Sequence, residues 1–110
     1  MSEVFKILGQ AAPSAATPTD LYTVPASTYT VVSTLNVCNQ NGSSVAVRVW
    51  IAIGGAATVS AQYLLYDTVV VKNMPLPITG GWTLSATDVV RVQTDTTGVS
   101  FNLFGTEFTP

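Results

Sequence analysis

Residues 28–53, which read TYTVVSTLNVCNQNGSSVAVRVWIAI, decide the fold of this chain. From Thr28 to Cys38 apolar and polar residues alternate, and the pattern predicts one buried face made of Tyr29, Val31, Leu35 and Val37. The same period of two continues from Ser44 to Ile53, with apolar residues at Val45, Val47, Val49, Ile51 and Ile53. Such alternation is typical of half-buried β-strands.

Between the two segments lies Asn39-Gln40-Asn41-Gly42-Ser43, whose Asn-Gly pair is a strong signal for chain reversal. The sequence therefore predicts a β-hairpin from Thr28 to Ile53. From Asp20 onward, similar short segments recur about every eight to twelve residues with Gly, Pro or Asn between them. This spacing predicts about seven to nine strands and no helical periodicity.

These features predict an all-β fold: a single-domain antiparallel β-sandwich, jelly-roll-like, with an extended N-terminal arm. An immunoglobulin-like sandwich is the alternative. The sandwich is expected over residues 20–110. Residues 1–19 are expected to be an arm or linker, because Gly9–Thr19 is rich in Ala, Pro, Ser and Thr and has no core pattern. Val4–Leu8 is a candidate short strand, and the sequence leaves open whether this segment packs on its own domain or on a neighbour.

Composition narrows the possible partners. The chain has 110 residues, of which 47% are hydrophobic and only 9% charged, against about 25% charged in an ordinary domain. Its four cations, Lys6, Arg48, Lys72 and Arg91, are scattered, so we expect no nucleic-acid binding. We expect no membrane association and no signal peptide, because no apolar run has the required length. A surface with so few charges favours contact with protein partners, although a neutral monomer kept soluble by hydroxyl groups remains the alternative.

No catalytic residues, cofactor or metal site are predicted. The chain has no histidine, which excludes the triads and metal sites that depend on imidazole. Its one cysteine, Cys38, cannot form an internal disulfide and is expected to be a small, half-buried apolar residue. Asp88 and Asp95 occur in turn sequences, where an Asp side chain binds the backbone.

Trp50 is the residue that most favours a binding role. Its neighbours Val49 and Ile51 are assigned to the core, so alternation turns Trp50 outward, beside Arg48. If Arg91 also faces outward, the three residues share one sheet surface. Trp and Arg are enriched where protein interfaces are strongest, and Trp also stacks on sugar rings. The alternative is that a loop, or the N-terminal segment, of the same subunit covers Trp50.

Several short motifs resemble those of small virion proteins of tailed bacteriophages. They follow one another in the same order over nearly the whole chain and are Lys6-Ile7-Leu8-Gly9-Gln10, Asp20-Leu21-Tyr22-Thr23-Val24-Pro25-Ala26, Val31–Leu35 with Val37-Cys38-Asn39, Tyr63-Leu64-Leu65-Tyr66-Asp67, Leu84-Ser85-Ala86-Thr87-Asp88 and Ser100-Phe101-Asn102-Leu103-Phe104-Gly105. The resemblance implies a jelly-roll-like subunit that forms homotrimers. It implies a head decoration, or cement, protein that joins neighbouring copies of the major capsid protein, and it implies no catalytic residues.

The sequence thus favours a non-enzymatic capsid decoration protein, made in the host cytoplasm and located on the virion surface. Its partners would be itself and the major capsid protein. The expected interface combines the surface around Trp50, Arg48 and Arg91 with an N-terminal clamp represented by Gln10, Pro13 and Pro18. The alternative is a module of a tail or fibre that binds host-surface glycan through Trp50. An accessory domain of an enzyme is neither indicated nor excluded.

Overall fold

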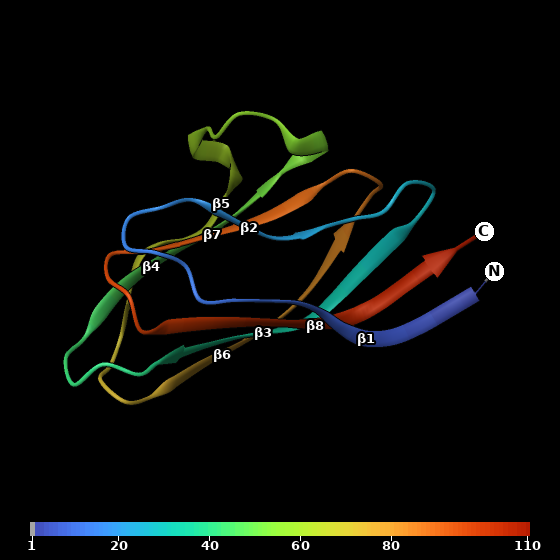
Figure 1. The fold of residues 1–110 in the computed structure, drawn as a ribbon. Coiled ribbons are helices and arrows are strands. Elements are labelled where there is room, and N and C mark those ends of the chain that lie inside the picture. The colour runs from blue at the N-terminus through green and yellow to red at the C-terminus, as the bar shows by residue number, and fades with distance from the viewer. Residues whose placement is uncertain (1) are drawn as a thin grey trace.

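The computed structural model describes residues 2–110 and consists of two packed β-sheets (Figure 1). Residue 1, the first of the expected arm, lies outside the described residues. All strand pairs are antiparallel, so the expected all-β sandwich is confirmed. The strands are β1 (Ser2–Ala11), β2 (Thr19–Thr23), β3 (Tyr29–Asn39), β4 (Val45–Ala52), β5 (Tyr63–Val70), β6 (Pro75–Leu84), β7 (Val89–Thr94) and β8 (Val99–Thr109).

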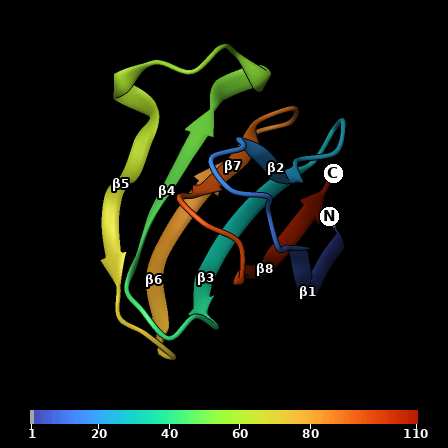
Figure 2. The ribbon, with the colours of Figure 1, turned by 60° about the vertical axis from the view of Figure 1, so that its left-hand side comes forward.

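The order of the strands identifies the sandwich as a jelly roll. Sheet A has the order β1-β8-β3-β6, and sheet B has the order β2-β7-β4-β5. The first strand therefore pairs with the eighth, the second with the seventh, the third with the sixth and the fourth with the fifth. This is the connectivity of one long hairpin wound into two sheets, which is the jelly-roll arrangement. β1 contacts β2 at one lateral edge of the sandwich, and β5 lies at the opposite edge (Figure 2).

The core lies between the two sheets and follows the alternation of the strands. Val47 and Val49 of β4 have no exposed surface, and neither do Phe101 and Leu103 of β8. Burying a side chain of this size contributes about 1.5–3 kcal/mol of stability. Because β4 belongs to sheet B and β8 to sheet A, these residues join the two sheets.

The expected hairpin between residues 28 and 53 is wrong in its pairing, although both strands exist. β3 hydrogen-bonds to β6 and β8, whereas β4 hydrogen-bonds to β5 and β7. The Asn-Gly segment therefore carries the chain from one sheet to the other. The reason is that Val37 and Val47 are both fully buried, and the apolar faces of the two strands meet across the core.

A β-bulge changes the face that the first half of β3 presents. The register of β3 shifts between Val32 and Thr34 on both of its neighbours. As a result Val32 is buried, whereas Tyr29, which the simple alternation assigned to the core, is exposed. A bulge adds one residue to a strand, so the buried positions change parity on passing it. Beyond the bulge, Leu35 and Val37 are buried as expected.

Most of the expected N-terminal arm is a strand of the sandwich. Ser2–Ala11 forms β1 and pairs with β8 along its whole length. Residues 12–18 connect β1 to β2, and the backbone N–H of Ala16 donates to the carbonyl of Thr94 at 2.7 Å. Residues 2–18 therefore do not form an arm outside the sandwich. Val4–Leu8 has the composition of a strand, and its backbone is paired with β8 in sheet A. In this chain the segment packs on its own subunit.

Two further strands complete the sheets. Tyr63–Val70 is one bent strand, with Asp67 at a φ of 51°. β6 runs from Pro75 to Leu84, through Gly80-Gly81, and it is an edge strand of sheet A. Residues 2–110 contain no helix with the length and apolar character required to cross a membrane.

Candidate interaction surface

The three residues expected to share an outer sheet face do share it. Trp50 of β4 and Arg91 of β7 are directly paired positions, and Arg48 precedes Trp50 by two residues on β4. All three lie on the face of sheet B that points away from the core. Their side chains therefore make their contacts on this outer face and not in the core between the sheets.

Trp50 is not presented to solvent, which corrects the expectation that it is an exposed contact residue. Only 1% of its surface is accessible. Its indole Nε1 donates a hydrogen bond to Thr58 Oγ1 at 3.1 Å, and the ring of Tyr63 lies 5.3 Å from its own, centroid to centroid. Thr58 belongs to the connection between β4 and β5, so this connection covers the Trp50 ring. The alternative in which a loop of the same subunit covers Trp50 is the one observed.

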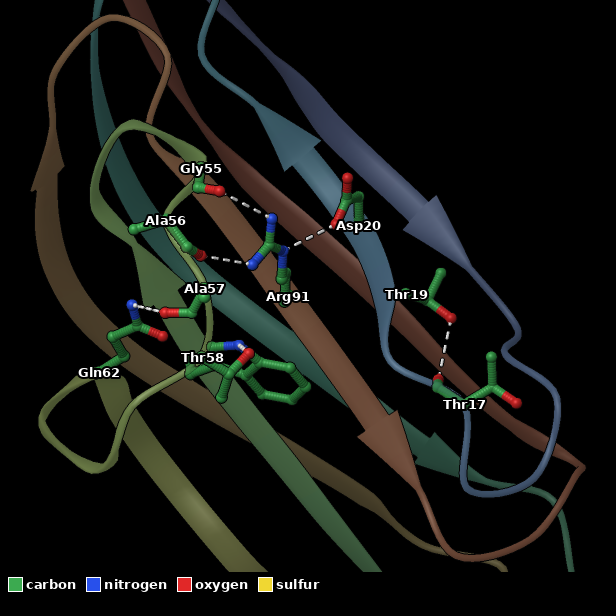
Figure 3. Close-up of polar contacts among 10 residues, drawn as sticks. Thr17, Thr19, Asp20, Gly55, Ala56, Ala57, Thr58, Gln62 and Arg91 are labelled. Carbon is green, nitrogen blue, oxygen red and sulfur yellow. Dashed lines mark hydrogen bonds and ion pairs between the residues drawn. The ribbon is translucent and has the colours of Figure 1, made fainter.

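Arg91 fastens this connection to the sheet (Figure 3). Its Nη1 donates to the carbonyl of Ala56 at 2.8 Å, and its Nη2 donates to the carbonyl of Gly55 at 3.3 Å. Its Nε donates to Asp20 Oδ1 of β2 at 3.0 Å. One guanidinium thus links β7, β2 and the connection over Trp50. A planar group with several fixed donors is suited to such a three-way contact.

Arg48 is engaged by two residues of β5. Its Nε donates to Asp67 Oδ1 at 2.7 Å and its Nη2 donates to Asp67 Oδ2 at 3.2 Å. The guanidinium carbon lies 4.2 Å from the ring centroid of Tyr66, in cation–π contact. The hydrogen bond from Arg48 lowers the pKa of Asp67, and the same bond raises the pKa of Arg48. The pair is electrically neutral as a unit and remains partly open to solvent.

The three residues assigned to the N-terminal clamp lie on β1 and in the connection that follows it. Gln10 belongs to β1 in sheet A, and its Nε2 donates to Asn102 Oδ1 of β8 at 2.7 Å. Pro13 is buried and Pro18 is exposed, and both lie in the connection from β1 to β2. This connection reaches the outer face of sheet B, because its Ala16 lines one hollow together with Arg48.

Two clusters of exposed apolar residues were missed by the sequence analysis. The β1 patch consists of the exposed residues Val4, Phe5 and Ile7 of β1, of which Phe5 and Ile7 line one hollow and Phe5 is 78% exposed. The β5 patch consists of Leu64, Tyr66, Val69 and Val71 on and just after β5. The β5 patch has a sequence signal in the uninterrupted apolar run at residues 63–66. The β1 patch also has a sequence signal, which is the β-propensity of residues 4–8. It was missed because residues 1–19 were expected to be an arm or linker.

A hollow of about 500 Å³ lies next to the β5 patch. The connection supplies Thr58, Val59 and Ser60 to its lining, and β5 supplies Tyr63 and Tyr66. The two tyrosine rings meet edge to face, 4.9 Å apart. Hydroxyl groups beside aromatic rings, with the nearest ion pair already neutral, make a surface suited to an uncharged polar ligand.

A second polar cluster joins β1 to the rest of the sandwich. Tyr22 Oη donates to Glu107 Oε2 at 2.5 Å and lies 2.8 Å from Thr30 Oγ1. Lys6 Nζ donates to Glu107 Oε1 at 3.1 Å. The bond from Tyr22, and then the one from Lys6, lower the pKa of Glu107, whereas burial and the bond to Glu107 raise the pKa of Tyr22. The four residues come from β1, β2, β3 and β8, so the cluster stabilises the meeting of four strands.

The carboxylate of Asp88 has a structural role. Asp88 is buried, and its two oxygens accept from the backbone N–H groups of Gly54 and Ser85, both at 2.9 Å. This is the turn role that the sequence indicated for Asp88. Within residues 2–110 no three His, Cys, Asp or Glu side chains are grouped so that they could hold a metal ion. What the described surface offers is contact by aromatic, aliphatic and hydroxyl groups.

No protein-family model matches the chain, and no curated protein matches it. Solved structures do. One is a chain of the T13 IBDV viral particle, where the match covers 96% of this chain and 29% of that one, with a TM-score of 0.55 and 10% identity. Two are crystal structures of a pentameric capsid protein isolated from metagenomic phage sequences. They cover 96% of this chain and 64% and 65% of the others, with TM-scores of 0.42 and 0.46 and identities of 17% and 18%.

The chain thus spans less than two-thirds of the length of each of these structures. At 10% identity the likeness to the IBDV particle chain is a likeness of fold, and it agrees with the two-sheet sandwich described above.

Proposed function

We propose that this protein is a non-enzymatic structural protein of a virus particle. The observation that carries the proposal is a jelly-roll sandwich whose surface is unusually apolar. Eleven large apolar side chains among the described residues are exposed, whereas the whole chain contains only four basic and six acidic residues. Exposed apolar clusters on a folded domain mark surfaces that other proteins cover. The fold is also shared with a chain of a viral particle, which supports the same class of function.

In its finer form the proposal is a homotrimeric decoration protein on the outside of the capsid of a tailed bacteriophage. Its copies would join neighbouring copies of the major capsid protein. The resemblance of its motifs to small phage virion proteins supports this form. Synthesis in the host cytoplasm and final location in the virion follow from it.

The mechanism of such a protein is burial of surface. Each copy would contribute about 25 cal/mol for each Å² of apolar area that it covers, and the contribution repeats at every lattice position. Few charges favour this, because a charge that loses its water without a partner opposes binding. Arg48 is already paired with Asp67 at 2.7 Å, so covering its face costs less than covering an unpaired charge would.

The expected interface residues would act in different ways. Arg48 and Gln10 are accessible enough to contact a neighbour, and Pro18 is exposed. Trp50 and Arg91 would act indirectly, by holding the β4–β5 connection in the shape that a neighbour meets.

The test is the copy number of the chain in purified particles of the virus that encodes it, measured by quantitative mass spectrometry against the major capsid protein. A copy number comparable to that of the major capsid protein is expected. A number close to that of the portal or tail-tip proteins would instead place the chain on the tail. Complete absence from particles would contradict every virion role.

A glycan-binding module of a tail or fibre is the second candidate, and the hollow beside Tyr63 and Tyr66 favours it. The covered Trp50 is replaced in this hypothesis by the exposed ring of Tyr66. A glycan array would test it: Tyr66→Ala should abolish binding, and Val69→Ala, outside the lining of the hollow, should not. Absence of binding by the unaltered chain would exclude this candidate.

A further inference from the structure

The two apolar patches lie at opposite edges of the molecule. β1 is the last strand of sheet A on one side, and β5 is the last strand of sheet B on the other (Figure 2). Phe5 is 78% exposed in the β1 patch, and Val69 is 63% exposed in the β5 patch. Both patches lie on edge strands, which have unpaired backbone groups on their outer side and are prone to contact other chains.

The charges beside the two patches are opposite in sign. Lys72 follows Val71 of the β5 patch, and it is the one cation among residues 2–110 that makes no ion pair. Glu3 precedes Val4 of the β1 patch and likewise makes no ion pair within those residues. The β1 patch therefore ends in a free negative charge and the β5 patch in a free positive charge. The unpaired charge beside each patch is therefore complementary to the unpaired charge beside the other.

We infer that the β1 patch of one copy of this chain docks on the β5 patch of the next copy. A contact between two different patches is heterologous, and repeated copies form a closed ring when the rotation between neighbours closes and an open filament when it does not. The inference takes self-association from the proposed function and adds the two surfaces that make it, with Glu3 of one copy placed against Lys72 of its neighbour. A contact of β1 with β1 would instead leave the β5 patch uncovered.

Mixing two variants tests this directly with the full chain. The mass of the wild-type chain in solution, measured by light scattering after gel filtration, should be that of a closed oligomer, three copies under the proposed function. Phe5→Glu and Val69→Glu should each give monomers, because each removes one half of every contact. An equimolar mixture of the two variants should give a discrete complex of one copy of each, since one intact β1 patch and one intact β5 patch remain. Ile53→Glu, at an exposed apolar residue outside both patches, is the matched control and should keep the wild-type mass.

The charges provide a second test that keeps the apolar surface intact. Glu3→Lys and Lys72→Glu should each weaken self-association about tenfold, and the double variant should restore it. Asp95→Lys changes the other exposed acid that makes no ion pair among the described residues, and it should have no effect.

The inference is overturned if Val69→Glu keeps the wild-type mass, if the mixture contains only monomers, or if the wild-type chain is itself monomeric. A monomeric chain that is abundant in particles would overturn this inference and leave the proposed function standing. A chain that behaves as expected in solution but is absent from particles would overturn the proposed function and leave this inference standing.

Discussion

After β3 the chain crosses from sheet A to sheet B at residues 40–44, and after β4 it turns back along residues 53–62. The first connection is organised by one buried amide. Asn39 is 1% exposed, and its Nδ2 faces the carbonyls of Ser43, Val70 and Val71 at 2.9, 3.1 and 3.3 Å. Its Oδ1 accepts from the backbone N–H of Asn41 at 2.9 Å.

The second connection is longer, mostly exposed, and held from outside by the guanidinium of Arg91. Hydrogen bonds sealed from water are costly to leave unmade, whereas those at the surface are replaced by water. The corner at Asn39 should therefore determine whether the fold forms. The connection at Arg91 should determine the shape of one outer face.

The largest effect is expected at the corner. Asn39→Ala removes the two N–H donors that the carbonyls of Ser43, Val70 and Val71 share, and we expect it to lower the free energy of unfolding by about 3 kcal/mol. Asn39→Asp should be at least as damaging, because a carboxylate would face the same carbonyl oxygens. Urea denaturation measures both.

Asn36→Ala is the matched control for the corner. Asn36 lies on β3 as well, but it is only half-buried and faces outward, so the loss should stay within about 0.5 kcal/mol. Equal losses at positions 36 and 39 would contradict the role given to the buried amide.

A smaller effect is expected at the second connection. Arg91→Met removes three hydrogen bonds that lie partly in water, and we expect a loss of about 1 kcal/mol. The more specific result is that Trp50 becomes accessible, since Arg91 holds the backbone at residues 55 and 56 over it. In a Trp82→Phe background, indole fluorescence should shift to longer wavelength and iodide should quench it more strongly.

Arg48→Met is the control for that experiment, because Arg48 lies on the same face but bonds to β5 and not to the connection. Its indole emission should match that of the parent. A covered Trp50 in Arg91→Met would show that the connection holds its position without the bonds of Arg91.

The same contrast explains which parts of the structure the sequence could predict. Alternation of apolar residues from Val45 to Val49 correctly predicted a strand and its buried face, because those side chains interact with the whole core. The hairpin was wrong because an Asn-Gly pair reports only that the chain reverses. The partners of the two strands are fixed by pairings with distant segments, such as Tyr29 of β3 with Phe108 of β8.

The candidate site was predicted less completely than the fold. The shared outward face of Arg48, Trp50 and Arg91 follows from the period of two and is observed. That Trp50 is covered does not follow from local pattern, because the cover depends on where residues 53–62 are held by Arg91. The β1 patch was missed for a related reason: residues 2–11 have a strand partner only in β8, at the other end of the chain.

The contacts around Glu107 share a property with each of the two connections. They involve a charged group, as the contacts of Arg91 do, and they are largely shielded from water, as those of Asn39 are. Its carboxylate bonds to Tyr22 and Lys6, and its side chain is 13% exposed. The pKa of Glu107 is lowered in the folded state. A group with a depressed folded pKa stabilises the fold fully above its unfolded pKa, about 4.3 for Glu, and this contribution is lost as the pH falls through the folded pKa.

Glu107→Gln should therefore lower the free energy of unfolding by about 1 kcal/mol at neutral pH, because the amide oxygen still accepts from Tyr22 but carries no charge. The difference between wild type and variant should shrink as the pH falls below that of an unfolded carboxyl group. Asp95→Asn is the matched control: Asp95 is exposed, makes no ion pair among the described residues and lies outside both patches, so the substitution should leave the acid dependence of the stability unchanged. Urea titrations at a series of pH values measure all three chains. A constant difference between wild type and Glu107→Gln across the acid range would show that these contacts stabilise β1 by packing, as the core does, and not through the charge of Glu107.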